Sequence, residues 1–226
     1  MVVVAILIAL LPAFAALVAV CGRRVSLWLV ALVGGGGWLL ALVLRAPILA
    51  FLDPRLVVSG YVASALAGLF EESVRFTLLR TEFVRRLSRR GATSLGLGWG
   101  LAEAVLIYAL PVVVAGGYGL AELLPGAIER NSAVAIHTSL ALLISTNPGS
   151  LRLLMTAIAL HTTVNCLAIA SLTIFNNVWV VEGLLLVVAV VLLALATTLA
   201  RKRAVLFLIG GVVFMVFRVL SPGIIR

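Results

Sequence analysis

Residues 56–79 read LVVSGYVASALAGLFEESVRFTLL, a run long enough to cross a membrane that nevertheless carries three charged side chains. A membrane-spanning helix needs about 20 predominantly apolar residues. The charges of Glu71, Glu72 and Arg75 all lie in the second half of the run. Because ionisable groups inside a bilayer are costly, they are expected to be paired or functional. The run therefore predicts a transmembrane helix that contributes to a buried polar site.

The whole chain has the composition of an integral membrane protein. Of its 226 residues, 64% are hydrophobic and 11% are charged, and the mean hydropathy is +1.28. These values exclude a water-soluble domain, so the lipid bilayer is the expected environment and no nucleic-acid partner is expected. The formal net charge of +9 is interpreted as a topology signal of a membrane protein.

Apolar runs separated by charged and turn residues predict an all-α, polytopic protein with about eight transmembrane helices in one domain, residues 1–226. The predicted spans are 2–20, 26–44, 56–79, 92–115, 128–146, 153–174, 178–200 and 204–220. The first run is interpreted as a membrane helix and not as a signal peptide, because its arginine pair, Arg23 and Arg24, follows the run.

The basic residues are concentrated in alternate loops. One side receives eleven of the 17: Arg23, Arg24, Arg80, Arg85, Arg86, Arg89, Arg90, Arg152, Arg201, Lys202 and Arg203. The other side has only Arg45, Arg55, Arg130 and Arg226 near its surface. By the positive-inside rule the first side is cytoplasmic, so this cell-membrane protein is expected to have both termini on the extracytoplasmic side.

Polar side chains recur at one depth in four consecutive predicted helices. They are Glu71, Glu72, Arg75, Glu103, His137, His161 and Asn165. By helix rise the set lies about 12–18 Å from the cytoplasmic ends of the helices. A common depth predicts one buried, hydrated site between helices 3–6, displaced toward the cytoplasm. Water is expected to reach it from that face, and substrate from that face or laterally, so that cleavage falls in the cytoplasmic half of a substrate segment.

Spacing within the helices supports a shared site. Three pairs are four residues apart and therefore share a helix face: Glu71 with Arg75, Trp99 with Glu103, and His161 with Asn165. Adjacent Glu71 and Glu72 point about 100° apart. One of them can then face water while the other pairs with Arg75 or with a neighbouring helix.

The residue types of the site limit its chemistry. The sequence offers no recognisable Ser-His dyad, no aspartyl pair and no His-Glu-x-x-His motif in the membrane. A glutamate can activate water, and histidine and asparagine can stabilise an oxyanion, which together amount to amide hydrolysis. A divalent metal such as zinc could instead activate the water. The candidate metal ligands are Glu71, Glu72, Glu103, His137 and His161.

Four motifs between about residues 60 and 170 resemble those of the glutamate-type intramembrane peptidases, a clan that includes the CAAX prenyl endopeptidases, the PrsW proteases and, most similar, the YhfC-like family. Residues 71–75 resemble the Glu-Glu-x-x-Arg motif, and residues 96–104 resemble a glycine-rich segment ending in Glu-Ala. Glu129-Arg130 with His137 resembles a Glu-Arg helix start followed by a histidine. His161 to Asn165 resembles the His-x-x-x-Asn/Asp motif.

The resemblance implies an intramembrane endopeptidase that acts on a membrane-anchored peptide or protein. Glu71 would be the water-activating base with Glu72 assisting, Glu103 a further carboxylate, and His161 with Asn165 the oxyanion clamp; His137 is added to this set. Trp99 stands where the YhfC pattern has histidine, which weakens the case for a metal. A non-catalytic scaffold of the APH type, from the same clan, and a small transporter are the alternatives.

Other polar and small residues receive structural interpretations. Arg75 either neutralises a glutamate or contacts substrate. Glu129 with Arg130 is expected to be an anchoring pair at a helix start near the outer interface. Glu122 and Glu182 are expected to be solvated at the outer surface. The glycine runs 34–37 and 96–100 are expected to allow close helix packing.

Overall fold

The protein is described here by a computed structural model that covers residues 1–202, and every regular element in that range is a helix. The predicted span 204–220 lies outside the described residues. Five helices are long and apolar enough to cross a membrane: Val2–Cys21 (α1), Val25–Leu49 (α2), Ser88–Ala115, Leu151–Phe175 (α8) and Val178–Ala200, which is part of α9 (Val178–Lys202). The prediction of an all-helical membrane protein is confirmed at this level.

Two further helices have the same length but a more polar composition. They are α3 (Val57–Arg80), with 24 residues, and α7 (Leu120–Ser145), with 26 residues. Both helices are less apolar than the five named above, because they carry most of the buried charged side chains. The short helix α4 (Glu82–Arg85) follows α3.

The ends of two helices differ from the predicted spans. Helix α2 continues to Leu49, so Arg45 lies inside the helix and not in a loop. Helix α7 begins at Leu120, so Glu129 and Arg130 lie in its interior and not at a helix start. Apolar residues lie on both sides of Arg45 and directly precede Glu129, which lets each helix continue past the charge. The predictions that placed these charged residues at the ends of their helices are therefore wrong.

The fourth predicted span is one rod built from three segments. Helix α5 (Ser88–Glu103) passes directly into the π-helical segment η1 (Ala104–Ala109) and then into α6 (Leu110–Ala115). The change from α to π geometry comes immediately after Glu103. Single-turn π segments are frequent at functional sites in helices.

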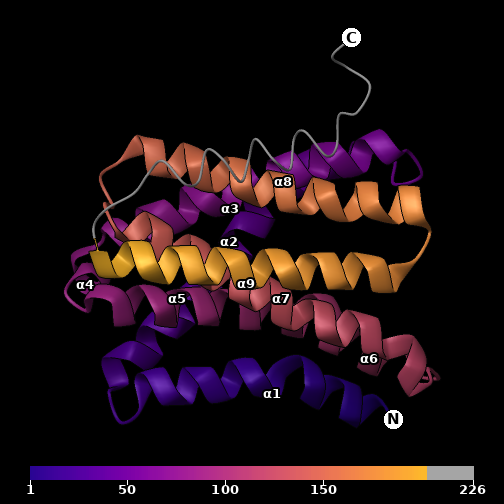
Figure 1. The fold of residues 1–226 in the computed structure, drawn as a ribbon, viewed down its shortest axis with the longest axis horizontal. Coiled ribbons are helices and arrows are strands. Elements are labelled where there is room, and N and C mark those ends of the chain that lie inside the picture. Colours follow the sequence, from indigo (N-terminus) through magenta and orange to yellow (C-terminus); the bar gives the residue numbers. More distant parts are fainter. Residues whose placement is uncertain (203–226) are drawn as a thin grey trace.

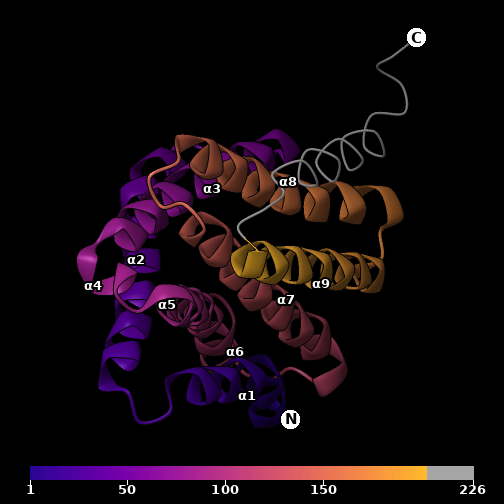
Figure 2. The same cartoon turned by 60° about the vertical axis from the view of Figure 1, so that its left-hand side comes forward.

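The long helices lie side by side, and the chain reverses direction at each connection (Figures 1 and 2). One end of the bundle holds the α1–α2 connection, α4 and the α7–α8 connection (Figure 1). We call it the basic end, because it carries Arg23 and Arg24 between α1 and α2, Arg85 and Arg86 at the end of α4, and Arg89 and Arg90 in the first turn of α5, and α8 begins beside it with Arg152. The opposite end, with the N-terminus and the α6–α7 and α8–α9 connections, is the distal end.

Glycines allow α5 to lie between α2 and α7 with its backbone close to both. A Cβ atom on Gly98 would lie 2.0 Å from the carbonyl oxygen of Ala31 on α2, and one on Gly96 would lie 2.6 Å from the Cα of Thr138 on α7. A Cβ on Gly34 would likewise lie 2.2 Å from the Leu95 oxygen. These contacts confirm the predicted role of both glycine runs in helix packing. They also place Trp99 and Glu103 between α2 and α7.

The half of the bundle interior next to the basic end is filled with apolar side chains. Its buried residues from α3, α5, α7 and α8 include Phe76, Leu79, Leu95, Leu140, Ile144, Ala157 and Leu160. We call this set the apolar plug. The buried charges lie on its distal side.

Candidate functional site

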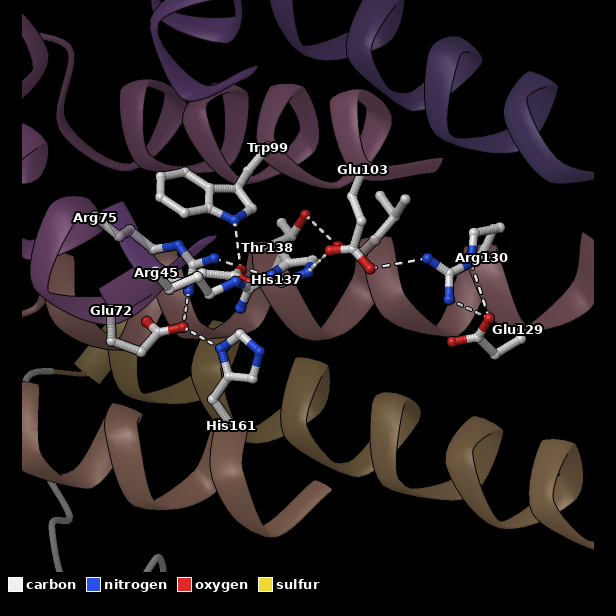
Figure 3. Close-up of polar contacts among 12 residues, drawn as sticks. Arg45, Glu72, Arg75, Trp99, Glu103, Glu129, Arg130, His137, Thr138 and His161 are labelled. Atoms are coloured by element: carbon white, nitrogen blue, oxygen red, sulfur yellow. Dashed lines mark hydrogen bonds and ion pairs between the residues drawn. The ribbon is translucent and has the colours of Figure 1, made fainter. Parts of the chain in front are cut away.

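Buried polar side chains from α2, α3, α5, α7 and α8 gather in the middle of the bundle. Figure 3 shows them spread in a row from Glu72 and Arg75 at one end to Arg130 and Glu129 at the other. They form two hydrogen-bonded clusters. The clusters meet where the Arg75 guanidinium lies 4.4 Å from the centre of the Trp99 ring, a cation–π geometry.

The first cluster is centred on Glu71. Arg45 donates from Nη1 to Glu71 Oε1 at 2.8 Å, and Trp99 donates from Nε1 to Oε2 at 3.0 Å. The Glu71 side chain is only 3% exposed. A buried carboxylate is tolerated when it is paired and hydrogen-bonded, and each of the two Glu71 oxygens has a donor.

The second cluster begins at Glu72, which is fully buried. Its Oε1 accepts from Arg75 Nη1 and, at 2.7 Å, from His161 Nδ1. Arg75 therefore pairs with Glu72, and Glu71 takes its partner from α2. This geometry agrees with the expectation that the two adjacent glutamates face different neighbours. The role of Glu72 here is to hold Arg75 and to orient the His161 ring.

Both ring nitrogens of His137 are occupied. Arg75 Nη2 lies 2.8 Å from Nδ1, and Glu103 Oε2 lies 2.6 Å from Nε2. Because a guanidinium can only donate, Nδ1 must accept, and the ring proton on Nε2 is donated to Glu103. His137 thus links α3 to α5 through α7.

Glu103 is also bound by an arginine on α7. Arg130 donates from Nη1 to Glu103 Oε1 at 2.8 Å, and its Nε and Nη2 atoms bond to Glu129. The Arg130 side chain is buried, whereas that of Glu129 is 29% exposed. The pair predicted to anchor a helix at the outer interface is therefore part of the buried network, because α7 extends nine residues beyond Glu129 on its distal side.

A cavity of about 250 Å³ adjoins the network. At roughly 30 Å³ per water molecule it has room for about eight waters. The polar part of its wall consists of Arg45, Glu71, Glu103, Glu129, His137, His161 and Asn165, and the rest includes Trp38, Ala67, Ile107, Ala133, Val164, Ala168 and Leu185. A polar cavity of this size is suited to holding ordered water.

The structure brings five of the predicted site residues to this cavity and leaves others behind it. Glu71, Glu103, His137, His161 and Asn165 line the wall. Glu72 and Arg75 are fully buried outside the cavity wall, and Trp99 contacts the site through its hydrogen bond to Glu71. Asn165 and His161 both line the cavity, and within residues 1–202 the Asn165 amide and His161 Nε2 make no hydrogen bond.

Three of the candidate metal ligands lie close together, but their donor atoms already have partners. One donor atom each from Glu71, His137 and His161 lie within 4.8 Å of one another. Both Glu71 oxygens accept from Arg45 and Trp99, and both His137 nitrogens are bonded. A metal would have to displace these partners and would face the positive charges of Arg45 and Arg75. In this arrangement the donor set does not fit a metal ion.

Sequence reasoning did not assign Arg45 to the site, and it interpreted Glu129 and Arg130, which belong to one of the four motifs, as an anchoring pair outside the site. The signal that could have identified Arg45 is the apolar run 46–52 that follows it, and for Glu129 and Arg130 it is the apolar stretch that precedes them. Glu182 on α9 was expected to be solvated but is only 6% exposed. Its position against α7, and not its place near a helix end, determines its burial.

No protein-family model, no curated protein and no solved structure matches the chain. The function is therefore inferred from the residues and geometry of the site.

Proposed function

We propose that the protein is an intramembrane endopeptidase that hydrolyses a peptide bond of a membrane-anchored protein or peptide. The observation that carries the proposal is the grouping of Glu71, His137 and His161, with donor atoms within 4.8 Å, on the wall of a cavity that can hold water. A carboxylate and an imidazole facing one water-filled space inside a membrane protein are suited to hydrolysis.

Glu71 is the group that activates water. A water molecule in the cavity gives one proton to the Glu71 carboxylate while its oxygen attacks the substrate carbonyl carbon. Arg45 and Trp99 hold the carboxylate in place. When the tetrahedral intermediate collapses, the C–N bond breaks and the departing amine takes the proton from Glu71, so that the carboxylate is regenerated.

His161 and Asn165 stabilise the oxyanion formed in this step. They lie one turn apart on α8 and both face the cavity. The Asn165 amide can donate as it stands, and His161 donates from Nε2 when that nitrogen carries a proton. Glu72 fixes the ring through Nδ1. Donors that are already oriented toward a developing charge are among the largest contributors to catalysis.

Glu103 and His137 form the opposite wall of the site. Arg130 and Arg75 anchor this pair from its two sides. Their bonds leave little freedom for either side chain, so they position the substrate chain and the cavity water, and Glu71 carries out the proton transfer.

The membrane arrangement that suits this function has all the long helices crossing the bilayer, including α3 and α7. Their charges face the bundle interior, where they are paired, as expected for ionisable groups in transmembrane segments. The basic end is placed in the cytoplasm by the positive-inside rule, with both termini extracytoplasmic in the cell membrane. The bilayer and a membrane-anchored substrate are the partners.

The purified protein in liposomes, tested against a library of membrane-anchored peptides with and without a strong chelator, tests this proposal. We expect cleavage that mass spectrometry can locate and that persists with the chelator, because the ligand atoms of His137 and Glu71 are bound to arginines. Stoichiometric zinc, lost together with activity in the His137→Ala variant, would instead establish a metal mechanism.

The scaffold and transporter alternatives predict different outcomes of the same experiment. A scaffold would cleave no peptide but would co-purify with a defined partner. A transporter would cleave no peptide but would move a solute across the liposome membrane. Either result would contradict the peptidase proposal.

A further inference from the structure

We infer that the site is reached from the distal end of the bundle, and that its substrate is the segment of a membrane-anchored peptide that lies on the distal side of the membrane. The nature of the occupant rests on the proposed peptidase function, whereas the direction of access rests on the cavity alone. This direction is the opposite of the one predicted from the depth of the polar residues.

The floor of the cavity lies well inside the bundle. His137, Glu71 and His161 stand eight, nine and ten residues from the ends of their helices at the basic end. By helix rise these distances amount to about 12–15 Å. Glu103 and Asn165 lie deeper, 15 and 14 residues from the basic ends of their helices, about 21–22 Å by helix rise.

The remaining wall residues lie on the distal side of this floor. Arg45 is only four residues from the distal end of α2, about 6 Å by helix rise. Ile107 on η1 is 52% exposed at the surface of the bundle, and the Glu129 side chain is 29% exposed. Leu185 lies in the distal half of α9. The cavity wall thus extends from the floor into the distal half, and we place the mouth of the cavity there, between α2, η1 and α7.

The basic-end side of the floor is closed by the apolar plug. Phe76, Leu140, Ile144 and Leu160 are each at most 5% exposed. A separate void between α7, α8 and α9 has a volume of about 10 Å³ and is lined by Ser139 and by leucine and alanine side chains. A void of this size and polarity cannot carry a chain of water molecules. Within residues 1–202, the plug and this void therefore leave the distal mouth as the route by which water in the cavity exchanges.

The direction of access decides which part of a substrate is cut. A helix conceals its peptide groups in internal hydrogen bonds, so a substrate must unwind before its carbonyl reaches Glu71. Unwinding is easiest where a segment leaves the membrane, and the mouth is near the distal surface. With the basic end in the cytoplasm, the cut falls in the extracytoplasmic half of the substrate segment or just beyond it.

Cysteine labelling tests the direction of access without any need for activity. In a background with Cys21→Ala and Cys166→Ser, Tyr118→Cys reports the distal side and Gly149→Cys reports the basic side. Cavity-wall variants Ala133→Cys and Ala168→Cys are compared with plug-side variants Ser139→Cys and Ala157→Cys on the same two helices. Each is treated with a membrane-impermeant, positively charged methanethiosulfonate on one side of sealed liposomes.

We expect the cavity-wall cysteines to react about 10-fold or more faster with reagent on the side that labels Tyr118→Cys, because thiol reactivity requires an exposed, ionisable sulfur. The plug-side cysteines should react from neither side. The Ser139→Cys change is isosteric, so the labelling rate on the plug side can be measured even if Ala157→Cys fails to fold. Labelling of the cavity wall from the Gly149→Cys side, or from neither side, would overturn the inference.

The position of the cut in the substrate provides a second test of the direction of access. We expect product ends in the distal half of the substrate segment, and cuts confined to the basic-end half would overturn the inference. Distal labelling in a protein that cleaves no peptide would leave the direction of access intact while the peptidase function fails. The two failures are therefore distinguishable.

Discussion

At the residue scale, the pairing of Arg45 with Glu71 determines how the proposed base is held. The pair joins α2 to α3 across 2.8 Å, with side chains 12% and 3% exposed. Removal of one partner from a buried ion pair leaves an uncompensated charge and costs about 3–5 kcal/mol. The pair is therefore both a structural link and a support for the site.

Replacement of Arg45 by methionine should lower the free energy of unfolding in detergent by about 3 kcal/mol. The same change in a Glu71→Gln background should cost much less, because the buried charge is then absent. Arg55→Met is the matched control, since Arg55 pairs with Asp53 at the exposed surface, and it should cause no measurable change. Equal losses in the parent and Glu71→Gln backgrounds would show that the two residues are not coupled.

For the site residues, the sequence alone predicts their presence in the membrane helices but not their hydrogen-bond partners. Glu71, Glu103, His137, His161 and Asn165 could be identified because a charge or amide stands out in an apolar helix. Which partner each would take could not, because pairing depends on side chains from other helices. Spacing alone placed Arg75 on the Glu71 face, whereas the structure pairs Arg75 with Glu72.

At the element scale, the glycines of α5 fix the distance between α2, α5 and α7. Gly98 faces the backbone of α2, so that a methyl group there would lie 2.0 Å from the Ala31 oxygen. Gly36 on α2 has no atom within 4 Å of the corresponding position. The two positions provide a matched pair for a packing test.

The Gly98→Ala variant should lose about 1–3 kcal/mol of stability, as expected for overpacking. Gly36→Ala should be unchanged or gain up to about 1 kcal/mol, because alanine favours a helix more than glycine does. Thermal unfolding of both variants in the same detergent measures the difference. If Gly98→Ala proves as stable as Gly36→Ala, α2 and α5 are not in close contact.

Helix positions could be predicted from apolar runs because a membrane helix must bury about 20 consecutive residues. Helix ends could not be predicted where a charge was interpreted as a boundary. Arg45 and Arg130 are inside helices because a glutamate on another helix compensates each charge. The π-helical geometry of η1 had no signal in the sequence.

For the molecule as a whole, the difference in exposed positive charge between the basic end and the distal end is larger in the structure than the sequence alone indicates. Arg45 and Arg130 were expected near the distal surface. In the structure both are bound in buried ion pairs and add no exposed positive charge there. The exposed Arg55 is left at the distal end of the described chain. The basic end retains the arginines of the α1–α2 connection and of α4.

This asymmetry predicts the orientation in cells. A cysteine introduced as Gly149→Cys should be labelled only from the cytoplasm, and one introduced as Tyr118→Cys should be labelled from outside intact cells. Both positions are exposed in the connections between helices. Labelling of Gly149→Cys by an impermeant reagent outside intact cells would reverse the orientation, and the half of the substrate that is cut would then be cytoplasmic.

The assignment of Glu71 as the base is tested most directly by comparing the peptide-cleavage rates of the parent, Glu71→Gln and Glu122→Gln proteins in liposomes. Glutamine keeps the size of Glu71 but cannot accept a proton, so turnover should fall by about 100-fold or more while the protein remains folded. Glu122, which is exposed and caps α7, is the control, and its variant should cleave as the parent does. Cleavage by Glu71→Gln at the parent rate would contradict the assignment of Glu71 as the base.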